Sequence, residues 1–382
     1  METRTIVILI IRFFSTMLTV FFLSIIFLPL IDQTFELDLD KKENTENRVL
    51  TARPDFSIDS VASFPRRYEG YFSDNFSFRN LLVNLNSTFT TKAYEISAIP
   101  DVLIGKEGWL YFVSKNQGNS REDFMGRLRM SQPDLDSIQS KLECRTRELQ
   151  TKGIRFLVAV APDKHSIYPD FLPDQTERKG RYPSRLDQIV RYLDRKSSVK
   201  ILDLRTTLIE KRDNASFPLF KKTDSHWNYF GAFIAYTEIM KSLQMIPKKE
   251  SDFQWTQITN PMGGDLAGML AASNQFKEEN EMMVSPLFKS ELTFAEVENN
   301  YGTGYKGKPM VATNKDRSLP KLLIFHDSFG GALQQFLSYH FRESVFIGSH
   351  YSSVIVKREK PDVVIVLTVE RYVDQILPLG EL

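Results

Sequence analysis

Short apolar runs alternate with helical patterns through most of this 382-residue chain. The runs are nearly continuous in Val, Ile, Leu and Phe, which is typical of parallel strands covered on both faces. The pattern predicts strands over residues 154–160, 199–204, 321–325 and 361–368. It predicts helices over residues 135–151, 184–193, 231–243 and 331–341. Such alternation predicts a three-layer α/β/α fold with a mainly parallel central sheet.

A long apolar stretch lies near the N-terminus, over residues 13–31. At about 1.5 Å per residue it would span roughly 28 Å as a helix, which matches the hydrocarbon core of a bilayer. A cleaved signal peptide is the alternative, but no small-residue cleavage site follows the stretch. Arg4 and Arg12 precede the stretch and Asp32 and Glu36 follow it, so the positive-inside rule predicts a cytoplasmic N-terminus. We therefore expect one uncleaved transmembrane helix.

The patterns divide the chain into three parts. Residues 1–31 form the cytoplasmic N-terminus and the anchor, and residues 32–98 form a tether and an amphipathic lead-in. Residues 99–382 form the main domain, which opens with a β hairpin predicted over residues 102–112. An insertion is expected at about 255–320, where glycines are frequent and periodicity is weak.

Charge and cysteine content exclude several classes of protein. Lys and Arg number 49 against 48 Asp and Glu, so no basic field predicts binding to nucleic acid. The one cysteine, Cys144, rules out an internal disulfide, and its helical pattern predicts a buried, inert thiol. A disulfide-free exported domain of this size favours a bacterial periplasm. Neither the Gly-x-Gly-x-x-Gly fingerprint nor a P-loop occurs, and we expect no cofactor.

Ser328 follows the strand predicted over residues 321–325, and Gly330 and Gly331 with a helical pattern come after it. A strand, a sharp turn and a helix place a hydroxyl at the carboxyl edge of the sheet, where helix amides stabilise an oxyanion. The alternative is that Asp327 or Ser328 only caps the helix. The local pattern alone leaves both interpretations open.

Asp224 and His226 lie two residues apart, ahead of the helix predicted over residues 231–243. An imidazole can take the proton of a serine hydroxyl, and a carboxylate can fix the imidazole tautomer. The alternative is that Asp224 caps the helix and His226 lies on its surface. Because one chain carries both this pair and a strand-end serine, we predict that Asp224, His226 and Ser328 form one hydrogen-bonded set.

A metal site is the rival interpretation for a chain with several histidines. The five histidines show no His-x-x-x-His spacing, and we expect no metal. Lys164 and His165 follow the strand predicted over residues 154–160, at the sheet edge where substrates bind. We expect positioning or structural roles for both of them.

Several short motifs are distributed along the chain after the apolar stretch. They are Glu46-Asn47-Arg48, Ala161-Pro162-Asp163-Lys164, the run from Thr223 to Ala232 around Asp224-Ser225-His226, His326-Asp327-Ser328-Phe329, and the segment from Pro361 to Glu370-Arg371. In combination these motifs resemble those of the alginate O-acetyltransferase family of SGNH-hydrolase-like proteins. The resemblance covers nearly the whole chain after the anchor.

This resemblance implies an SGNH-hydrolase-like fold in which the Asp-x-His pair precedes the serine. It implies that Ser328 is the nucleophile, His226 the general base and Asp224 the residue that orients His226. It also implies the membrane-anchored type with a single catalytic domain, and a membrane-bound O-acyltransferase as the partner that supplies the acetyl group. The candidates for a second oxyanion donor are Gly263, Gly264 and Asn314.

We therefore predict an O-acetyltransferase that modifies an exopolysaccharide or cell-surface glycan through an acyl-serine intermediate. It would be a single-pass protein of the bacterial inner membrane with its catalytic domain in the periplasm. A glycan O-acetylesterase with the same triad and a non-catalytic polysaccharide-binding or assembly subunit are the alternatives. The candidate substrate-binding residues are Lys164, Trp227, Tyr229 and Arg371.

Overall fold

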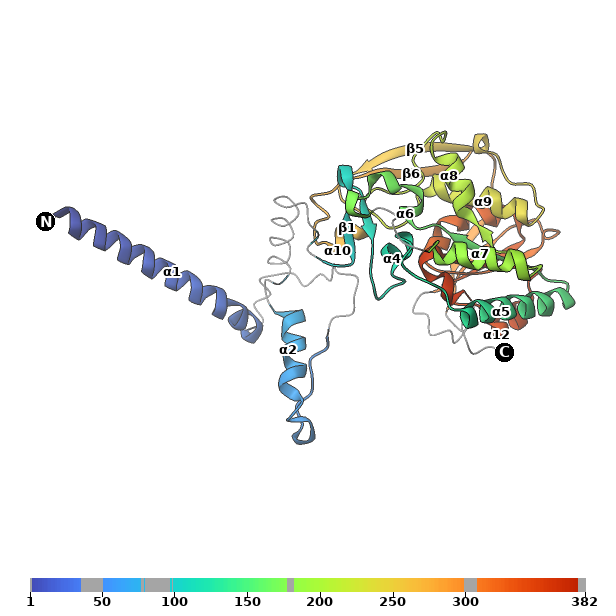
Figure 1. The fold of residues 1–382 in the computed structure, drawn as a ribbon. Helices are drawn as coiled ribbons and strands as arrows, with labels where there is room; N and C mark the ends of the chain where they lie inside the picture. Colours follow the sequence, from blue (N-terminus) through green and yellow to red (C-terminus); the bar gives the residue numbers. More distant parts are fainter. Residues whose placement is uncertain are drawn as a thin grey trace. The chain divides into compact units, whose positions relative to one another are not determined.

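The structure of the protein is a computed structural model, which describes residues 2–35, 51–76, 79, 97, 99–176, 182–298 and 308–376. Contacts divide the chain into two compact units (Figure 1). The first unit comprises residues 1–98 with 268–272, and the second comprises residues 99–267 with 273–382.

A single long helix, α1 (Glu2–Phe35), begins the first unit. Its segment Ile10–Leu28 has 19 residues with a mean hydropathy of 2.1, and none of it is buried. Among the described residues this is the one helix long and apolar enough to cross a bilayer, so it fits a single-pass membrane anchor. Most of the tether predicted after it lies outside the described residues, and the lead-in contains helix α2 (Phe64–Asn75).

A seven-stranded sheet with the order β4-β3-β11-β9-β10-β8-β7 forms the centre of the second unit. The first five strands in this order are parallel, and β8 pairs antiparallel with both of its neighbours. The prediction of a mainly parallel sheet is confirmed. The strands are β3 (Arg155–Ala161), β4 (Leu202–Asp203), β7 (Thr293–Glu296), β8 (Met310–Thr313), β9 (Lys321–His326), β10 (Glu343–Ile347) and β11 (Val363–Val369).

Alternate residues of the central strands face two separate hydrophobic cores. In β3, Ala159 and Ala161 belong to one core, whereas Val158 and Val160 belong to the other, as the two-residue period of a strand requires. Helices α8 and α9 contribute to the first core, and helices α5, α7 and α12 to the second (Figure 1). The predicted α/β/α fold class is confirmed. The helices are α5 (Gln132–Thr151), α7 (Arg185–Lys196), α8 (Leu204–Arg212), α9 (Tyr229–Ser242) and α12 (Ser353–Glu359).

Helix α5 shows how one helix face decides which side chains are buried. Ile138, Leu142 and Leu149 are its buried residues, and they pack on the second core. Cys144 comes two residues after Leu142, which is about 200° around the helix, and its side chain is exposed. The prediction of a buried thiol is therefore wrong, because a helical pattern alone does not say which face of the helix points inward.

The smaller elements of this unit surround the central sheet. A hairpin of β1 (Val102–Ile104) and β2 (Leu110–Phe112) confirms the one predicted over residues 102–112. The predicted helix over residues 331–341 is instead a series of short helical turns. These turns are η6 (Ser328–Leu333), α11 (Gln334–Leu337) and η7 (Ser338–His340). Further short helices are α4 (Ser120–Phe124) and α6 (Lys164–Ile167), and α10 (Asp265–Met269) begins in this unit and ends in residues assigned to the first.

The weakly periodic region at about 255–320 contains regular structure in the residues that the structure describes. A two-stranded sheet pairs β5 (Phe253–Asn260) with β6 (Glu278–Pro286), and β7 and β8 then join the edge of the central sheet. All four residues of β7 are exposed. A strand without a buried face has no reason to alternate apolar and polar residues, and this explains the weak signal in the sequence.

Candidate active site

Ser328 begins the 3₁₀ helix η6, just after strand β9, and its side chain is exposed. The preceding residue, Asp327, caps this helix by accepting a hydrogen bond from the backbone N–H of Phe329 at 2.9 Å. The other oxygen of Asp327 accepts from the backbone N–H of Val369 in the adjacent strand β11 at 2.6 Å. Asp327 therefore fills the capping role, and the hydroxyl of Ser328 can serve another partner.

Asp224 and His226 lie in the loop before helix α9, which is capped by a different residue. The side chain of Asn228 accepts from the backbone N–H groups of Phe230 and Gly231, both at 3.0 Å. Oδ1 of Asp224 instead accepts from Nδ1 of His226 at 2.7 Å and from the backbone N–H of His226 at 3.0 Å. The interpretation of Asp224 as a helix cap is thus excluded by the position of Asn228.

One chain of hydrogen bonds joins the three predicted residues. Nε2 of His226 lies 2.7 Å from Oγ of Ser328, and Nδ1 of His226 lies 2.7 Å from Oδ1 of Asp224. A proton on Nδ1, shared with the carboxylate, leaves Nε2 as the acceptor for the serine proton. The set lies at the carboxyl end of the parallel strand β9, where ligands bind in open α/β sheets. This arrangement meets the needs of a serine nucleophile.

Two contacts hold the loop of residues 221–228 in place. Glu278 in β6 accepts hydrogen bonds from the backbone N–H and the hydroxyl of Thr223, at 2.7 and 2.6 Å. The indole N–H of Trp227 donates to the carbonyl oxygen of Phe329 at 3.1 Å, which connects this loop to the turn that carries the serine. Sequence reasoning missed Glu278, because a single acidic residue in a polar strand carries no distinctive signal.

The carboxylate of Asp224 stays ionised in spite of its burial. Burial raises the pKa of Asp224, but the hydrogen bond from His226, the charge of His226 and the charge of Lys221 outweigh that effect and hold the pKa below its usual range. An ionised Asp224 stabilises a positive charge on the imidazole. The electrostatics therefore suit a base that becomes protonated during a reaction.

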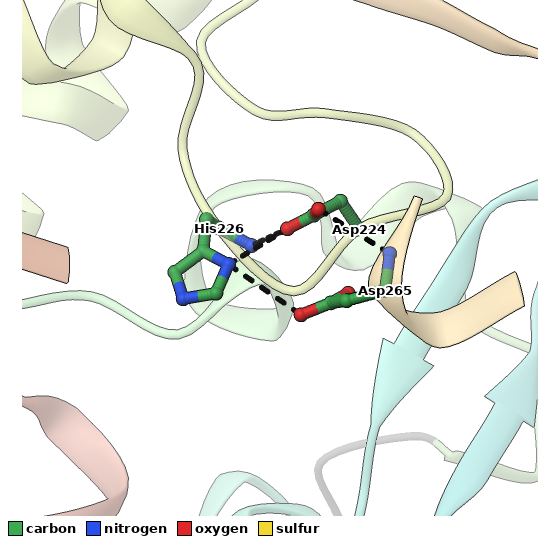
Figure 2. A group of neighbouring side chains, drawn as sticks. All are labelled: Asp224, His226 and Asp265. Carbon is green, nitrogen blue, oxygen red and sulfur yellow. Dashed lines mark hydrogen bonds and ion pairs between the residues drawn. The ribbon is translucent and has the colours of Figure 1, made fainter. Parts of the chain in front are cut away.

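A second carboxylate, that of Asp265, lies beside His226 and was not predicted (Figure 2). Its Oδ2 lies 3.5 Å from Nδ1 of His226, and its backbone N–H donates to Oδ2 of Asp224 at 3.3 Å. Gly264 permits this close approach, because a Cβ at that position would lie 2.5 Å from Cβ of Asp224. The run Gly263-Gly264-Asp265 is the sequence signal for this contact.

The three candidates for a second oxyanion donor have other partners. Their backbone N–H groups donate as follows: Gly263 to the carbonyl of Ser273 at 2.8 Å, Gly264 to the hydroxyl of Thr223 at 2.9 Å, and Asn314 to the carbonyl of Arg342 at 2.9 Å. These donors are engaged within the fold. The N–H of Ser328, as the first residue of helix η6, has no partner within that helix.

Asp224, His226 and Asp265 also have possible ligand atoms within 4.8 Å of one another, which is close enough to hold a metal ion. Nδ1 of His226, however, is hydrogen-bonded to Asp224, and both oxygens of Asp265 accept hydrogen bonds from Ser225. The polar atoms of this group are thus engaged in hydrogen bonds, partly with one another and partly with Ser225 and Ser328. Their arrangement is that of a hydrogen-bonded network around one imidazole.

A pocket of about 260 Å³ opens beside Ser328. Its other lining residues are Lys221, His226, Trp227, Asn228, Tyr229, Glu281, Phe329 and Ala332. Two predicted substrate-binding residues thus lie at the pocket: Trp227 is buried and Tyr229 is exposed. Lys221 and Glu281 form an ion pair at 3.0 Å on its wall.

The other two predicted substrate-binding residues, Lys164 and Arg371, lie in the interior. Nζ of Lys164 donates to the carbonyl oxygens of Leu110 and Lys222, at 2.8 and 3.1 Å, and burial lowers its pKa to about 8. The guanidinium of Arg371 forms an ion pair with Asp163. Neither residue lines the pocket beside the serine. In this structure both side chains brace the loops at the strand ends.

An α/β/α sandwich that joins an Asp, a His and a Ser at the carboxyl end of a parallel strand is the arrangement of serine-hydrolase-like α/β proteins. Within this class, the chain belongs to the family described as "SGNH hydrolase-like domain, acetyltransferase AlgX", whose model matches residues 102–345.

The chain is also similar to curated relatives and to solved structures. The "Probable alginate O-acetylase AlgJ" of Pseudomonas aeruginosa is 27% identical over 169 residues, which cover 43% of this chain and 38% of the relative. The match thus spans less than half of that relative. Bacillus cereus PatB1 has 18% identity and a TM-score of 0.49, over 71% of this chain and 96% of PatB1. The O-acetyltransferase domain of Pseudomonas putida AlgJ has 19% identity and a TM-score of 0.42, over 74% of this chain and 95% of that domain.

Proposed function

We propose that this protein is a serine-dependent O-acetyltransferase in which Ser328 is the nucleophile, His226 the general base and Asp224 the residue that orients the base. The observation that carries the proposal is the unbroken chain of two 2.7 Å hydrogen bonds from the serine hydroxyl through the imidazole to the carboxylate. Membership in a family described by an acetyltransferase supports the choice of acetyl transfer.

The first half of the reaction forms an acetyl-serine. Oγ of Ser328 attacks the carbonyl carbon of an acetyl ester or thioester while Nε2 of His226 takes the hydroxyl proton. The N–H of Ser328 is the proposed donor to the oxyanion of the tetrahedral intermediate. Collapse of that intermediate expels the alcohol or thiol of the donor, which leaves with the proton from His226. The ionised Asp224 stabilises the imidazolium in between.

The second half transfers the acetyl group to a glycan hydroxyl. The acceptor oxygen attacks the acetyl-serine while Nε2 of His226 takes the acceptor proton, and the same proton then returns to Oγ of Ser328. Tyr229 and Trp227 line the pocket where this acceptor would bind. Of the two, Tyr229 is exposed, and an exposed aromatic side chain can offer a flat apolar face to the C–H face of a sugar ring. The proposed acceptor is an exopolysaccharide or a cell-surface glycan.

The proposed setting is the bacterial inner membrane. Helix α1 fits a single-pass anchor, and we propose that the N-terminus is cytoplasmic and the catalytic domain periplasmic. The proposed division of the chain remains residues 1–31, 32–98 and 99–382, with the region at about 255–320 as an insertion. A periplasmic enzyme needs an acetyl source outside the cytoplasm. We propose that a membrane-bound O-acyltransferase supplies it.

A transferase and an esterase differ in whether the acetyl group of the acetyl-serine passes to a glycan hydroxyl or to water. We expect the full-length chain in detergent to release 4-nitrophenol slowly from 4-nitrophenyl acetate, and faster when its glycan acceptor is added. The reason is that a bound hydroxyl can exceed the effective concentration of water, about 55 M, by orders of magnitude. Mass spectrometry of the glycan should show added acetyl groups. Free acetate as the one product, across surface glycans of the source organism, would identify an esterase instead.

Gly264→Ala should lower the rate of acetyl transfer by about tenfold or more. The new Cβ would lie 2.5 Å from Cβ of Asp224 and 3.0 Å from its Oδ2, so the carboxylate that orients His226 must shift. Gly331→Ala is the matched control, because nothing lies within 4 Å of a Cβ there. Turnover of 4-nitrophenyl acetate by both variants provides the measurement. Equal rates for the two variants would show that the position of Asp224 tolerates the shift.

A further inference from the structure

Asp265 is held in one orientation by the turn that carries His226. Its Oδ1 accepts from the backbone N–H of Ser225 at 2.7 Å, and its Oδ2 accepts from the hydroxyl of Ser225 at 2.6 Å. The backbone N–H of Asp265 donates to Oδ2 of Asp224. This leaves Oδ2 of Asp265 at 3.5 Å from Nδ1 of His226 (Figure 2). The imidazole therefore has two carboxylates on the same side.

We infer that Asp265 is a positioning residue of the proposed acetyl transfer, and that its carboxylate strengthens His226 as a base. Its negative charge would stabilise the imidazolium that forms when Ser328 loses its proton. Its backbone N–H would at the same time fix the carboxylate of Asp224, which orients the ring. This inference rests on the proposed function, because it assigns a second partner to the same base.

The other charged groups around His226 do not replace this carboxylate. Asp224 binds Nδ1 directly, whereas on the pocket side Lys221 is paired with Glu281 at 3.0 Å. The buried ammonium of Lys164 interacts with the charges of both Asp224 and Asp265. The aromatic neighbour of the imidazole is Phe329, with ring centroids 4.9 Å apart. Asp224 thus makes the direct hydrogen bond to Nδ1 of His226, and Asp265 is a second carboxylate beside the same ring.

The two carboxylates differ in how readily they become neutral. Burial and then the like charge of Asp224 raise the pKa of Asp265, whereas the pKa of Asp224 is lowered. As the pH falls, Asp265 is therefore the first of the two to bind a proton. An ionised carboxylate 3.5 Å from Nδ1 also stabilises a positive charge on the ring during the reaction. For both reasons we expect the loss of Asp265 to change turnover mainly in the acid part of the pH profile.

The test is the pH dependence of acetyl-ester turnover by the full-length chain with Asp265→Asn. Asparagine keeps the size of the side chain and can still accept from the N–H of Ser225, but it removes the charge. We expect kcat to fall by about tenfold with little change in KM, and the acid limb to move to lower pH by about half a unit. We expect this direction because the neutral side chain no longer stabilises a positive charge on the ring.

Two further variants make the result specific. Asp265→Glu keeps the charge, and we expect its acid limb to return toward that of the unchanged protein. Asp194→Asn is the matched control, because Asp194 lies on helix α7 and pairs with the exposed Lys200; its profile should not move. An acid limb that stays in place in Asp265→Asn overturns the inference, even when kcat falls, because a merely structural brace would lower kcat without moving the limb.

Ser328→Ala separates failure of this inference from failure of the proposed function. Loss of turnover in Ser328→Ala together with an unmoved limb in Asp265→Asn leaves the triad intact and removes Asp265 from it. Full turnover in Ser328→Ala overturns the proposed function itself. If Asp265→Asn does not fold, the charge-retaining Asp265→Glu and the charge-removing Asp265→Ser give the same comparison.

Discussion

Ser328→Ala should abolish acetyl transfer, with a fall of at least about 10⁴-fold in kcat, because the variant has no oxygen to form the acetyl-enzyme. The melting temperature should hardly change. Ser328 is exposed, and the helix that it begins is capped by Asp327, so the substitution costs less than the roughly 1 kcal/mol of a lost cap. Turnover of an activated acetyl ester and mass spectrometry of the acetylated Ser328 peptide are the measurements.

Ser349→Ala is a matched control for this experiment. Ser349 follows β10, the parallel neighbour of β9, and its hydroxyl donates to the carbonyl of His350 at 3.0 Å. Ser349 therefore offers a hydroxyl at a similar place in the fold, but that hydroxyl is bonded to a carbonyl oxygen and not to an imidazole. We expect turnover close to that of the unchanged protein. If Ser328→Ala unfolds but its soluble fraction remains active, the alternative is correct, and this serine only stabilises the start of the helix.

Asp224→Asn should lower kcat by about 10³- to 10⁴-fold while the protein stays folded. Asparagine can still accept from the backbone N–H of His226, but its amide can also present N–H to Nδ1 and so favour the wrong tautomer of the ring. The buried negative charge that stabilises the imidazolium is lost as well. The expected effect is much larger than that of Asp265→Asn, because Asp224 makes the 2.7 Å hydrogen bond to the ring.

Circular dichroism and turnover across a range of pH values test this prediction. Asp252→Asn is the control. Asp252 accepts a hydrogen bond from the backbone N–H of Lys249 at the start of the short helix η5 (Glu250–Asp252), as Asp224 does from a backbone N–H in its own loop. A loss of less than tenfold in Asp224→Asn would contradict the role of Asp224. A larger effect in Asp265→Asn than in Asp224→Asn would exchange the roles of the two carboxylates.

The sequence predicts the layers of this fold because the layers arise from local and repetitive physics. The central strands β3, β9 and β11 are buried on both faces, so nearly every residue in them is apolar and the runs stand out. The meeting of His226 and Ser328 was predictable for a related reason. A serine just after a parallel strand must lie at the carboxyl edge of the sheet, where a nucleophile and its base would meet.

Long-range pairing decided the features that the sequence did not predict. Strand β7 is exposed, and its place at the sheet edge depends on β8, which no local period encodes. Strand β10 is mostly buried, but its apolar run is too short to identify it as a strand from the sequence. Its pairing with β9 shows that it is one. Cys144 is exposed because of the direction in which helix α5 packs.

The composition of the site shows the same division. Asp224, His226 and Ser328 were predictable because serine chemistry demands those residue types and the local pattern places them at the ends of elements. Asp265 lies 40 residues from the turn that it braces, and Gly264 brings it there by lacking a Cβ. Lys164 has the sequence position of a substrate-binding residue, but the carbonyls that enclose its ammonium come from other segments. The sequence by itself determined the central strands β3, β9 and β11 and the residues proposed to react. Only the tertiary structure decided which side chains surround the base, because those contacts join segments that lie far apart in the chain.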